Sequence, residues 1–250
     1  MGFRLTAMNA PKSRWVALLR QLSYRLLPGQ CLLCGMPSCQ PADLCSDCAL
    51  ELPINDPACP VCALPTPTSR HRSIPCGACL ASPPPYRTCT AALRYEFPVD
   101  RLINRFKHHG KFSAGAALAD LLLERLRRQP ALPELMVPVP LHWRRQWQRG
   151  FNQANWLAHY LGKRLAIPTD NRLLKRLRHT SRQQGQTRGQ RLANLKGAFS
   201  LNRTVGGTSI ALIDDVVTTG TTVREISRLL LDAGAISVDV WCLARTPLEK

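Results

Sequence analysis

Acidic residues are scarce in this chain, and its sequence has no long apolar run. Its 16 Asp and Glu face 34 Lys and Arg, which gives a formal net charge of +18. No stretch approaches the roughly 18 to 20 uninterrupted apolar residues that span a membrane. Residues 15–27 are apolar but contain Arg20 and Arg25, and no small-residue cleavage site follows them. We therefore expect no transmembrane segment, no signal peptide and a cytoplasmic location.

The shortage of acid is most pronounced between Leu141 and Lys196. This segment holds 13 Lys and Arg and a single acid, Asp170, so it contributes +12 to the net charge. A surface this basic attracts polyanions, because counterions are released when phosphates bind. Affinity for nucleic acid is the favoured interpretation. The alternative is a basic protein whose arginines serve a small phosphorylated ligand.

Disulfide bonds are not expected in the cytoplasm, so the 11 Cys of the chain are better explained as metal ligands. Eight of them form four consecutive Cys-x-x-Cys pairs: Cys31/Cys34, Cys45/Cys48, Cys59/Cys62 and Cys76/Cys79. Such a pair forms a tight turn that presents two thiolates to one zinc ion. A four-cysteine site leaves no open coordination position, so we expect structural zinc.

The spacing of these pairs allows two arrangements. In the favoured one the first two pairs bind one zinc ion and the last two bind a second, which makes a double zinc ribbon. An interleaved arrangement, with pairs one and three on one ion, fits the same spacing. The region is rich in proline and has little apolar core, so we expect no helix through it and a folding free energy that depends on metal. Gly35 and Gly77 are expected to adopt unusual backbone conformations.

Residues 88–250 alternate between strand and helix patterns. The expected strands are 90–95, 135–139, 209–213 and 236–242, and the expected helices are 98–108, 116–126, 153–165 and 221–233. Strands that alternate with helices predict an α/β fold in which a parallel sheet has helices on both faces.

The run from Ile210 to Val223 carries the candidate ligand site. Its first residues predict a buried parallel strand, which Asp214 and Asp215 close. The segment Thr218-Thr219-Gly220-Thr221-Thr222 then leads into a helical pattern. Ligands of open α/β sheets bind at the carboxyl ends of strands, and a helix N-terminus binds phosphate. The run favours binding of a phosphorylated ribose, in which the two carboxylates contact sugar hydroxyls or a metal ion. The alternative is an ordinary strand–turn–helix.

Cationic and aromatic residues follow the 135–139 strand. The cations that form a candidate pyrophosphate clamp are Arg144, Arg145 and Arg149. Guanidinium groups bind phosphate bidentately, although a basic loop at a sheet edge remains the alternative. The aromatic residues among them are Trp143, Trp147 and Phe151. This mixture suits binding of single-stranded nucleic acid.

The polar stretch 179–196 fits a lid over a bound phosphate, a nucleic-acid-binding loop or a linker.

The run from Ile210 to Val223 resembles the 5-phosphoribosyl-1-pyrophosphate (PRPP) signature of type I phosphoribosyltransferases. By that resemblance, Asp214 and Asp215 hold the ribose 2- and 3-hydroxyls, and the 218–222 loop holds the 5-phosphate. The resemblance also implies magnesium bound together with PRPP.

Together the motifs resemble the ComF family, and within it the GntX-like proteins of Gram-negative bacteria. The match is carried by the cysteine pairs, Arg149-Gly-Phe-Asn-Gln153, Arg191-Leu-Ala-Asn-Leu-Lys-Gly-Ala-Phe199 and Asp214-Asp-Val-Val-Thr-Thr-Gly-Thr-Thr222. The resemblance covers roughly residues 28–246 and implies an N-terminal zinc ribbon fused to a type I phosphoribosyltransferase fold. It further implies a link to the uptake or use of extracellular DNA, with gluconate uptake as another possibility.

Three segments are expected: a basic amphipathic segment over 1–27, a double zinc ribbon over 28–87 and a phosphoribosyltransferase-like domain over 88–250. The favoured function is a PRPP-binding protein that serves DNA uptake, with single-stranded DNA and a helicase-like uptake motor as partners. The alternatives are an active phosphoribosyltransferase of nucleobase or nucleotide metabolism and a zinc-ribbon adaptor without catalysis. The 1–27 segment either packs on its own protein or docks on a partner or membrane surface.

Overall fold

The computed structural model describes residues 29–38, 43–66, 74–142, 146–147, 149–177 and 197–247. The chain divides into two compact units, Met1–Glu51 and Leu52–Lys250. The first four cysteines of the Cys-x-x-Cys pairs lie in the first unit, and the last four lie in the second. The expected segments 1–27, 28–87 and 88–250 remain a prediction.

The first unit is small. Its strands β1 (Gly29–Gln30) and β2 (Pro37–Ser38) pair antiparallel, and the helix α2 (Ser46–Leu50) follows them. The β1–β2 turn holds Cys31 and Cys34, and α2 begins directly after Cys45.

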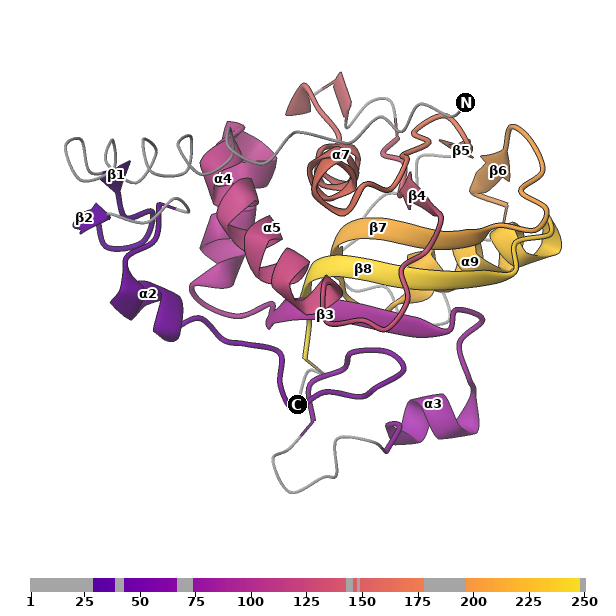
Figure 1. Cartoon of the computed structure of the whole chain (residues 1–250), viewed down its shortest axis with the longest axis horizontal. Helices are drawn as coiled ribbons and strands as arrows, with labels where there is room; N and C mark the ends of the chain where they lie inside the picture. The colour runs from indigo at the N-terminus through magenta and orange to yellow at the C-terminus, as the bar shows by residue number, and fades with distance from the viewer. Residues whose placement is uncertain are drawn as a thin grey trace, which may run out of the picture. The chain divides into compact units, whose positions relative to one another are not determined.

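The second unit is built on a parallel sheet (Figure 1). Its strands are β3 (Thr88–Arg94), β8 (Ser237–Arg245), β7 (Ser209–Val217) and β4 (Leu135–Pro138), in that spatial order. All three strand pairings are parallel. The two central strands β7 and β8 are apolar runs, as expected for strands that are covered on both faces.

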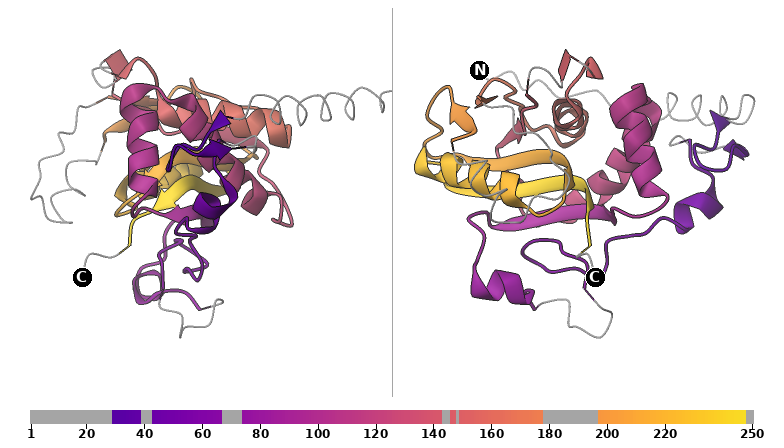
Figure 2. Two further views of the ribbon diagram at one scale, coloured as in Figure 1. Left: turned by 90° about the vertical axis from the view of Figure 1, so that its left-hand side faces the viewer. Right: turned by 180° about the vertical axis from the view of Figure 1, so that it is seen from behind.

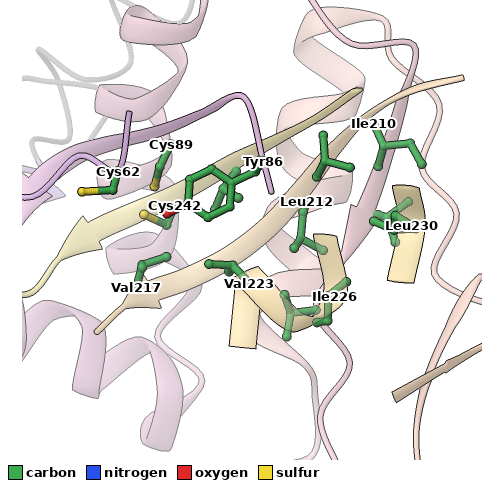
Figure 3. Close-up of a cluster of buried hydrophobic side chains, with 14 of the residues drawn as sticks. Cys62, Tyr86, Cys89, Ile210, Leu212, Val217, Val223, Ile226, Leu230 and Cys242 are labelled. Atoms are coloured by element: carbon green, nitrogen blue, oxygen red, sulfur yellow. The ribbon is translucent and has the colours of Figure 1, made fainter. Parts of the chain in front are cut away.

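Helices cover both faces of this sheet (Figure 2). The helices of one face are α4 (Val99–His109), α5 (Phe112–Leu126) and α7 (Gln153–Leu165). The helix α9 (Thr221–Asp232) covers the other face, where Ile226 and Leu230 pack against Ile210 and Leu212 of β7 (Figure 3). The predicted α/β fold is confirmed: a parallel sheet has helices on both faces.

The second cysteine cluster shares the α9 face of the sheet. Its residues, Cys59, Cys62, Cys76 and Cys79, belong to the same buried core as Cys89 of β3 and Cys242 of β8, with Tyr86 beside Cys242 (Figure 3). The Cys89 N–H donates to the carbonyl of Val61 at 2.8 Å. The second ribbon therefore completes the cover over the part of the sheet that α9 leaves open.

Several elements differ from the prediction. The strand β7 continues to Val217, so Asp214 and Asp215 lie within the strand rather than after it. The expectation of no helix among the cysteines was wrong, since α2 and α3 (Gly77–Ala81) each form a short helix directly after a cysteine. Gly77 begins α3 with an ordinary φ, whereas Gly35 has the expected positive φ of 75°.

A short antiparallel hairpin was not anticipated. It pairs β5 (Leu174–Arg176) with β6 (Phe199–Leu201). None of the helices in the described ranges combines the length and apolar character that crossing a membrane requires.

Candidate functional site

The acidic pair lies near the carboxyl end of the central strand β7. Asp214 and Asp215 are both half-buried, and each carboxylate accepts a hydrogen bond from the backbone N–H of the next residue, at 2.8 and 2.7 Å. Successive side chains of a strand point to opposite faces. Asp215 faces the side of α4, where it meets a lysine, and Asp214 shares the face of Leu212.

The ionisation of Asp214 depends on its burial and on its neighbours. Burial, and next the negative charge of Asp215, raises the pKa of Asp214 to about 7. The Asp215 N–H and the Lys107 ammonium act in the opposite direction. At neutral pH, Asp214 is therefore close to its midpoint and can gain or lose a proton when a ligand arrives.

Lys107 contacts the acidic pair and was not predicted. Its Nζ lies 3.0 Å from Oδ2 of Asp215, and both side chains are largely buried. Lys107 stands in the last turn of α4, where a basic residue is ordinarily explained by the helix dipole. The sequence therefore carried no signal that would have separated it from a solvent-exposed lysine.

A hydrogen-bonded link connects this lysine to the predicted clamp. Arg149 Nη1 donates to Oε1 of Gln153 at 3.2 Å, and Gln153 Nε2 donates to the backbone carbonyl of Lys107 at 3.3 Å. Gln153 is fully buried. Burial, followed by the charges of Arg149 and Lys107, lowers the pKa of His108. Arg149 and Lys107 thus create one positive region beside the carboxylates.

Asn152 fixes the start of α7 next to Arg149. Its Oδ1 accepts hydrogen bonds from the N–H groups of Ala154 and Asn155, and its Nδ2 donates to the carbonyl of Val139 at 3.1 Å. This N-cap ties the helix to the end of β4. Arg144 and Arg145, the other members of the predicted clamp, lie outside the described residues, as do the 1–27 and 179–196 segments.

The threonine-rich loop joins β7 to α9. Gly220 has a φ of 75°, a left-handed conformation that glycine adopts without strain, and it caps the N-terminus of α9. Thr221 and Thr222 form the first turn of the helix, while Thr218 and Thr219 are exposed. The Oγ1 atoms of Thr219 and Thr221 lie 2.9 Å apart. The first turn of a helix offers N–H groups and a positive dipole end, so this loop can hold a phosphate.

The eight paired cysteines gather as two clusters in sequential order, as the favoured arrangement predicts. The first cluster is Cys31, Cys34, Cys45 and Cys48, and the second is Cys59, Cys62, Cys76 and Cys79. The Sγ atoms of Cys34 and Cys45 are 3.7 Å apart, and so are those of Cys62 and Cys76. Four sulfurs about 2.3 Å from a central zinc ion lie roughly 3.8 Å from each other. Both clusters therefore have the size of a tetrahedral zinc site.

The thiols also have the electrostatics of metal ligands. Burial opposes ionisation, yet backbone N–H groups lower the pKa of Cys31 to about 6 and that of Cys59 to about 7. The pKa of Cys62 is raised, by burial and by the neighbouring cysteines. Thiols packed this closely ionise together only around a cation, which fits zinc.

The two clusters repeat one turn geometry. The N–H of Gly35 donates to the carbonyl of Cys31, and the N–H of Ala63 donates to that of Cys59, both at 2.9 Å. Ala63 has a φ of 55°, similar to that of Gly35. The second site thus holds an alanine in a backbone conformation that favours glycine, so the positive φ was not apparent from residue type.

The aromatic residues beside the clamp have different environments. Trp147 is 89% exposed. Phe151 instead packs against Phe106 and Phe112, with ring centroids 5.4 and 5.1 Å apart. Trp143 lies outside the described residues. Of the two aromatics described, only Trp147 presents its ring to solvent.

Comparison with known proteins supports this arrangement. A family model described as "Double zinc ribbon domain" matches residues 22–80. The DNA utilization protein YhgH of Salmonella typhimurium is 41% identical over 226 residues, which cover 88% of this chain and 98% of the relative. Competence protein F of Haemophilus influenzae is 38% identical over 210 residues, which cover 81% of this chain and 90% of the relative. The chain belongs to the ComF family, together with these proteins.

A solved structure of a phosphoribosyltransferase is a more distant match. Adenine phosphoribosyltransferase from Leishmania tarentolae is 15% identical, with a TM-score of 0.36 over 58% of this chain and 73% of its own. A likeness of this size carries no information on ligand or activity.

Proposed function

We propose that this ComF-family protein binds PRPP together with magnesium at the carboxyl end of β7, and that it serves the uptake or use of DNA in the cytoplasm. The observation that carries the proposal is the order of groups along one strand end. The half-buried pair Asp214 and Asp215 is followed by the left-handed Gly220 and the N-terminus of α9. These groups can contact the hydroxyls and the phosphate of a phosphorylated sugar and the metal ion that accompanies it.

Each residue has a defined part in this binding mode. The backbone N–H groups and hydroxyls of the 218–222 loop donate to the 5-phosphate. The carboxylates of Asp214 and Asp215 accept hydrogen bonds from the ribose hydroxyls. Magnesium supplies positive charge to the pyrophosphate oxygens. Arg149, held by Gln153, adds a guanidinium to the same anion, with Arg144 and Arg145 as further members of the clamp.

This arrangement also suits phosphoribosyl transfer. In such a reaction the bond between the anomeric carbon and pyrophosphate breaks with its electron pair on the leaving oxygen, and a bond to a nucleophilic nitrogen forms. Asp214 and Asp215 would stabilise the positive charge that develops on the ribose, and Arg149 would stabilise the leaving pyrophosphate. If the protein is an enzyme, it would transfer the phosphoribosyl group to a nucleobase.

Calorimetric titration of the zinc-loaded protein with magnesium and PRPP tests the site. Binding should be lost when Asp214 and Asp215 are both replaced by Asn. The matched control is Asp232→Asn, which removes an exposed carboxylate at the far end of α9 and should leave affinity unchanged. Equal affinity in the double variant, or no binding by the unaltered protein, would contradict the proposal.

A second candidate function is binding of single-stranded DNA. The net charge of +18 and the exposed Trp147 favour it, because cations beside a free ring suit phosphate contact and base stacking. Relatives are named for DNA utilization and competence. Affinity for an oligonucleotide should fall steeply with salt and weaken in Trp147→Ala. Binding that is independent of salt would exclude this role.

The zinc ribbons offer a third role, as an adaptor for a helicase-like motor of DNA uptake. A pull-down of such a motor should then require zinc. A complex that survives chelation of zinc would show that the zinc ribbons do not recruit the motor.

A further inference from the structure

Arg245 joins the second cysteine cluster to the threonine-rich loop. It is the last residue of β8, and its side chain is only 7% exposed. Its Nε donates to the carbonyl of Cys62 at 3.1 Å. Its Nη1 donates to the carbonyls of Val217, at 3.0 Å, and of Thr218. One guanidinium therefore contacts both a predicted zinc ligand residue and the first residues of the candidate phosphate loop.

The contact on the loop fixes the direction of its N–H groups. In a trans peptide the N–H points opposite to the carbonyl of the preceding residue. Because the carbonyls of Val217 and Thr218 point to Arg245, the N–H groups of Thr218 and Thr219 point to the opposite side. The carbonyl of Val217 also accepts from the Thr246 N–H at 3.0 Å. Arg245 shares the Val217 carbonyl with Thr246 and also holds the Thr218 carbonyl, so it helps to set which backbone groups of the loop can donate to an anion.

The contact on the ribbon depends on the cysteine turn. The carbonyl of Cys62 is followed by Ala63, whose φ of 55° is unfavourable for a residue with a side chain. The turn is held by the Cys59 N–H, which donates to the Leu64 carbonyl at 2.8 Å, and by the four thiols. Small metal sites of this kind hold their fold through the metal. The position of the Cys62 carbonyl should therefore depend on zinc.

We propose that zinc in the Cys59, Cys62, Cys76 and Cys79 cluster sets the phosphate affinity of the 218–222 loop through Arg245. Arg245 is a positioning residue: it aligns the loop without contacting the ligand. The proposal rests on the phosphate site proposed above. The first cluster belongs to the other unit of the chain, so its zinc should have no such effect.

The chain offers a matched pair of arginines for the test. The side chain of Arg224 in α9 also donates to this part of the chain, from Nη2 to the carbonyl of Ser82 at 3.2 Å, and only the backbone N–H of Arg224 contacts the loop, at the Gly220 carbonyl. Arg245→Lys keeps the positive charge but removes the guanidinium, whose separate nitrogens donate to the Cys62 carbonyl and to the loop carbonyls. Ribose 5-phosphate and magnesium–PRPP are titrated calorimetrically into the full chain carrying Arg245→Lys or Arg224→Lys. Zinc content and thermal unfolding are measured on the same samples.

We expect Arg245→Lys to weaken both ligands at least tenfold with its zinc content unchanged, and Arg224→Lys to stay within twofold of the unaltered protein. Hydrogen exchange at the 218–222 amides should accelerate in Arg245→Lys alone. Unchanged affinity in Arg245→Lys overturns the inference and leaves the phosphate site standing. No binding of either ligand to the unaltered protein overturns the phosphate site and the inference together.

A second comparison separates the two clusters. Cys76→Ser removes a ligand of the second cluster and Cys34→Ser removes one of the first. Loss of one zinc ion per chain should weaken ribose 5-phosphate binding in Cys76→Ser and leave it intact in Cys34→Ser. Equal affinities in two folded variants would overturn the inference. If Cys76→Ser does not fold, the arginine pair still decides it.

Discussion

Lys107 Nζ lies 3.0 Å from Asp215 Oδ2, which joins the last turn of α4 to the end of the central strand. This ion pair gives the two carboxylates different electrostatic environments. Asp215 has its own cation, whereas Asp214 carries the raised pKa. Asp214 is therefore the member of the pair whose proton uptake responds to the neighbouring negative charge.

The raised pKa of Asp214 predicts how binding depends on pH. A carboxylate must lose its proton to accept from ribose hydroxyls or to approach magnesium, so affinity for magnesium–PRPP should rise as pH increases through about 7. Stability should change in the opposite direction. The folded protein holds the proton on Asp214 more tightly than the unfolded chain does. The contribution of Asp214 to the free energy of unfolding should therefore decrease as pH rises from about 4 to 7. Calorimetry across pH 5.5–8.5 and thermal unfolding check the two signs.

The Asp215→Asn variant provides the control for this pH profile. Removing the neighbouring charge should lower the pKa of Asp214 and shift the binding midpoint to lower pH, because like charges disfavour ionisation. A midpoint that stays near 7 would show that another group titrates.

Replacing Lys107 should destabilise the protein and shift the same profile the other way. Lys107→Met leaves Asp215 half-buried without its cation, which we expect to cost about 2 kcal/mol. The pKa of Asp214 should rise, since Lys107 lowers it, and binding should move to higher pH. Urea unfolding and the pH profile measure both effects. The control Lys111→Met removes an exposed lysine nearby and should alter neither.

The N-cap of α7 should contribute measurably to stability. Asn152→Ala removes an acceptor for two N–H groups and a donor to Val139, and we expect a loss of about 1 to 2 kcal/mol. Asn152→Ser keeps a hydroxyl that can cap the helix, so its loss should be smaller. Urea unfolding of the two variants compares them, and equal losses would show that the contact with Val139 dominates.

The α9 face of the sheet should be sensitive to cavities. Ile226 is fully buried against β7, so Ile226→Ala should cost about 3 kcal/mol. Ile236→Ala deletes the same atoms at a side chain that is 69% exposed and should change stability by about 0.5 kcal/mol or less. Chemical unfolding distinguishes the two, and similar losses would contradict the packing of α9 on this face.

Much of the fold could be predicted because its signals are local. The apolar run of β7, the periodicity of α9 and the spacing of the cysteine pairs each lie within about 20 residues. The α7 boundaries agree with the predicted 153–165, and in the structure Asn152 caps the start of this helix. The sequential grouping of the cysteines was favoured for the same reason, since neighbouring pairs can close a site over short loops.

The contacts that link the site to the rest of the molecule could not be predicted from local patterns. Lys107 reaches Asp215 across more than 100 positions of sequence, and Arg245 reaches Cys62 across 183. Neither residue differs in type from many other basic residues of this chain. The short β5–β6 hairpin was missed because three-residue strands carry too little alternation to be detected.

The boundary at Glu51/Leu52 has a practical consequence for anyone who trims this chain. A fragment that begins at residue 88 would lose the cover over Cys89, Ala91 and Cys242, and a bare apolar sheet face promotes aggregation. A fragment that begins at Leu52 keeps this cover and its zinc cysteines. This apolar face of the sheet is covered by a segment whose four cysteines fit a zinc site, so loss of zinc should first appear as precipitation of the second unit.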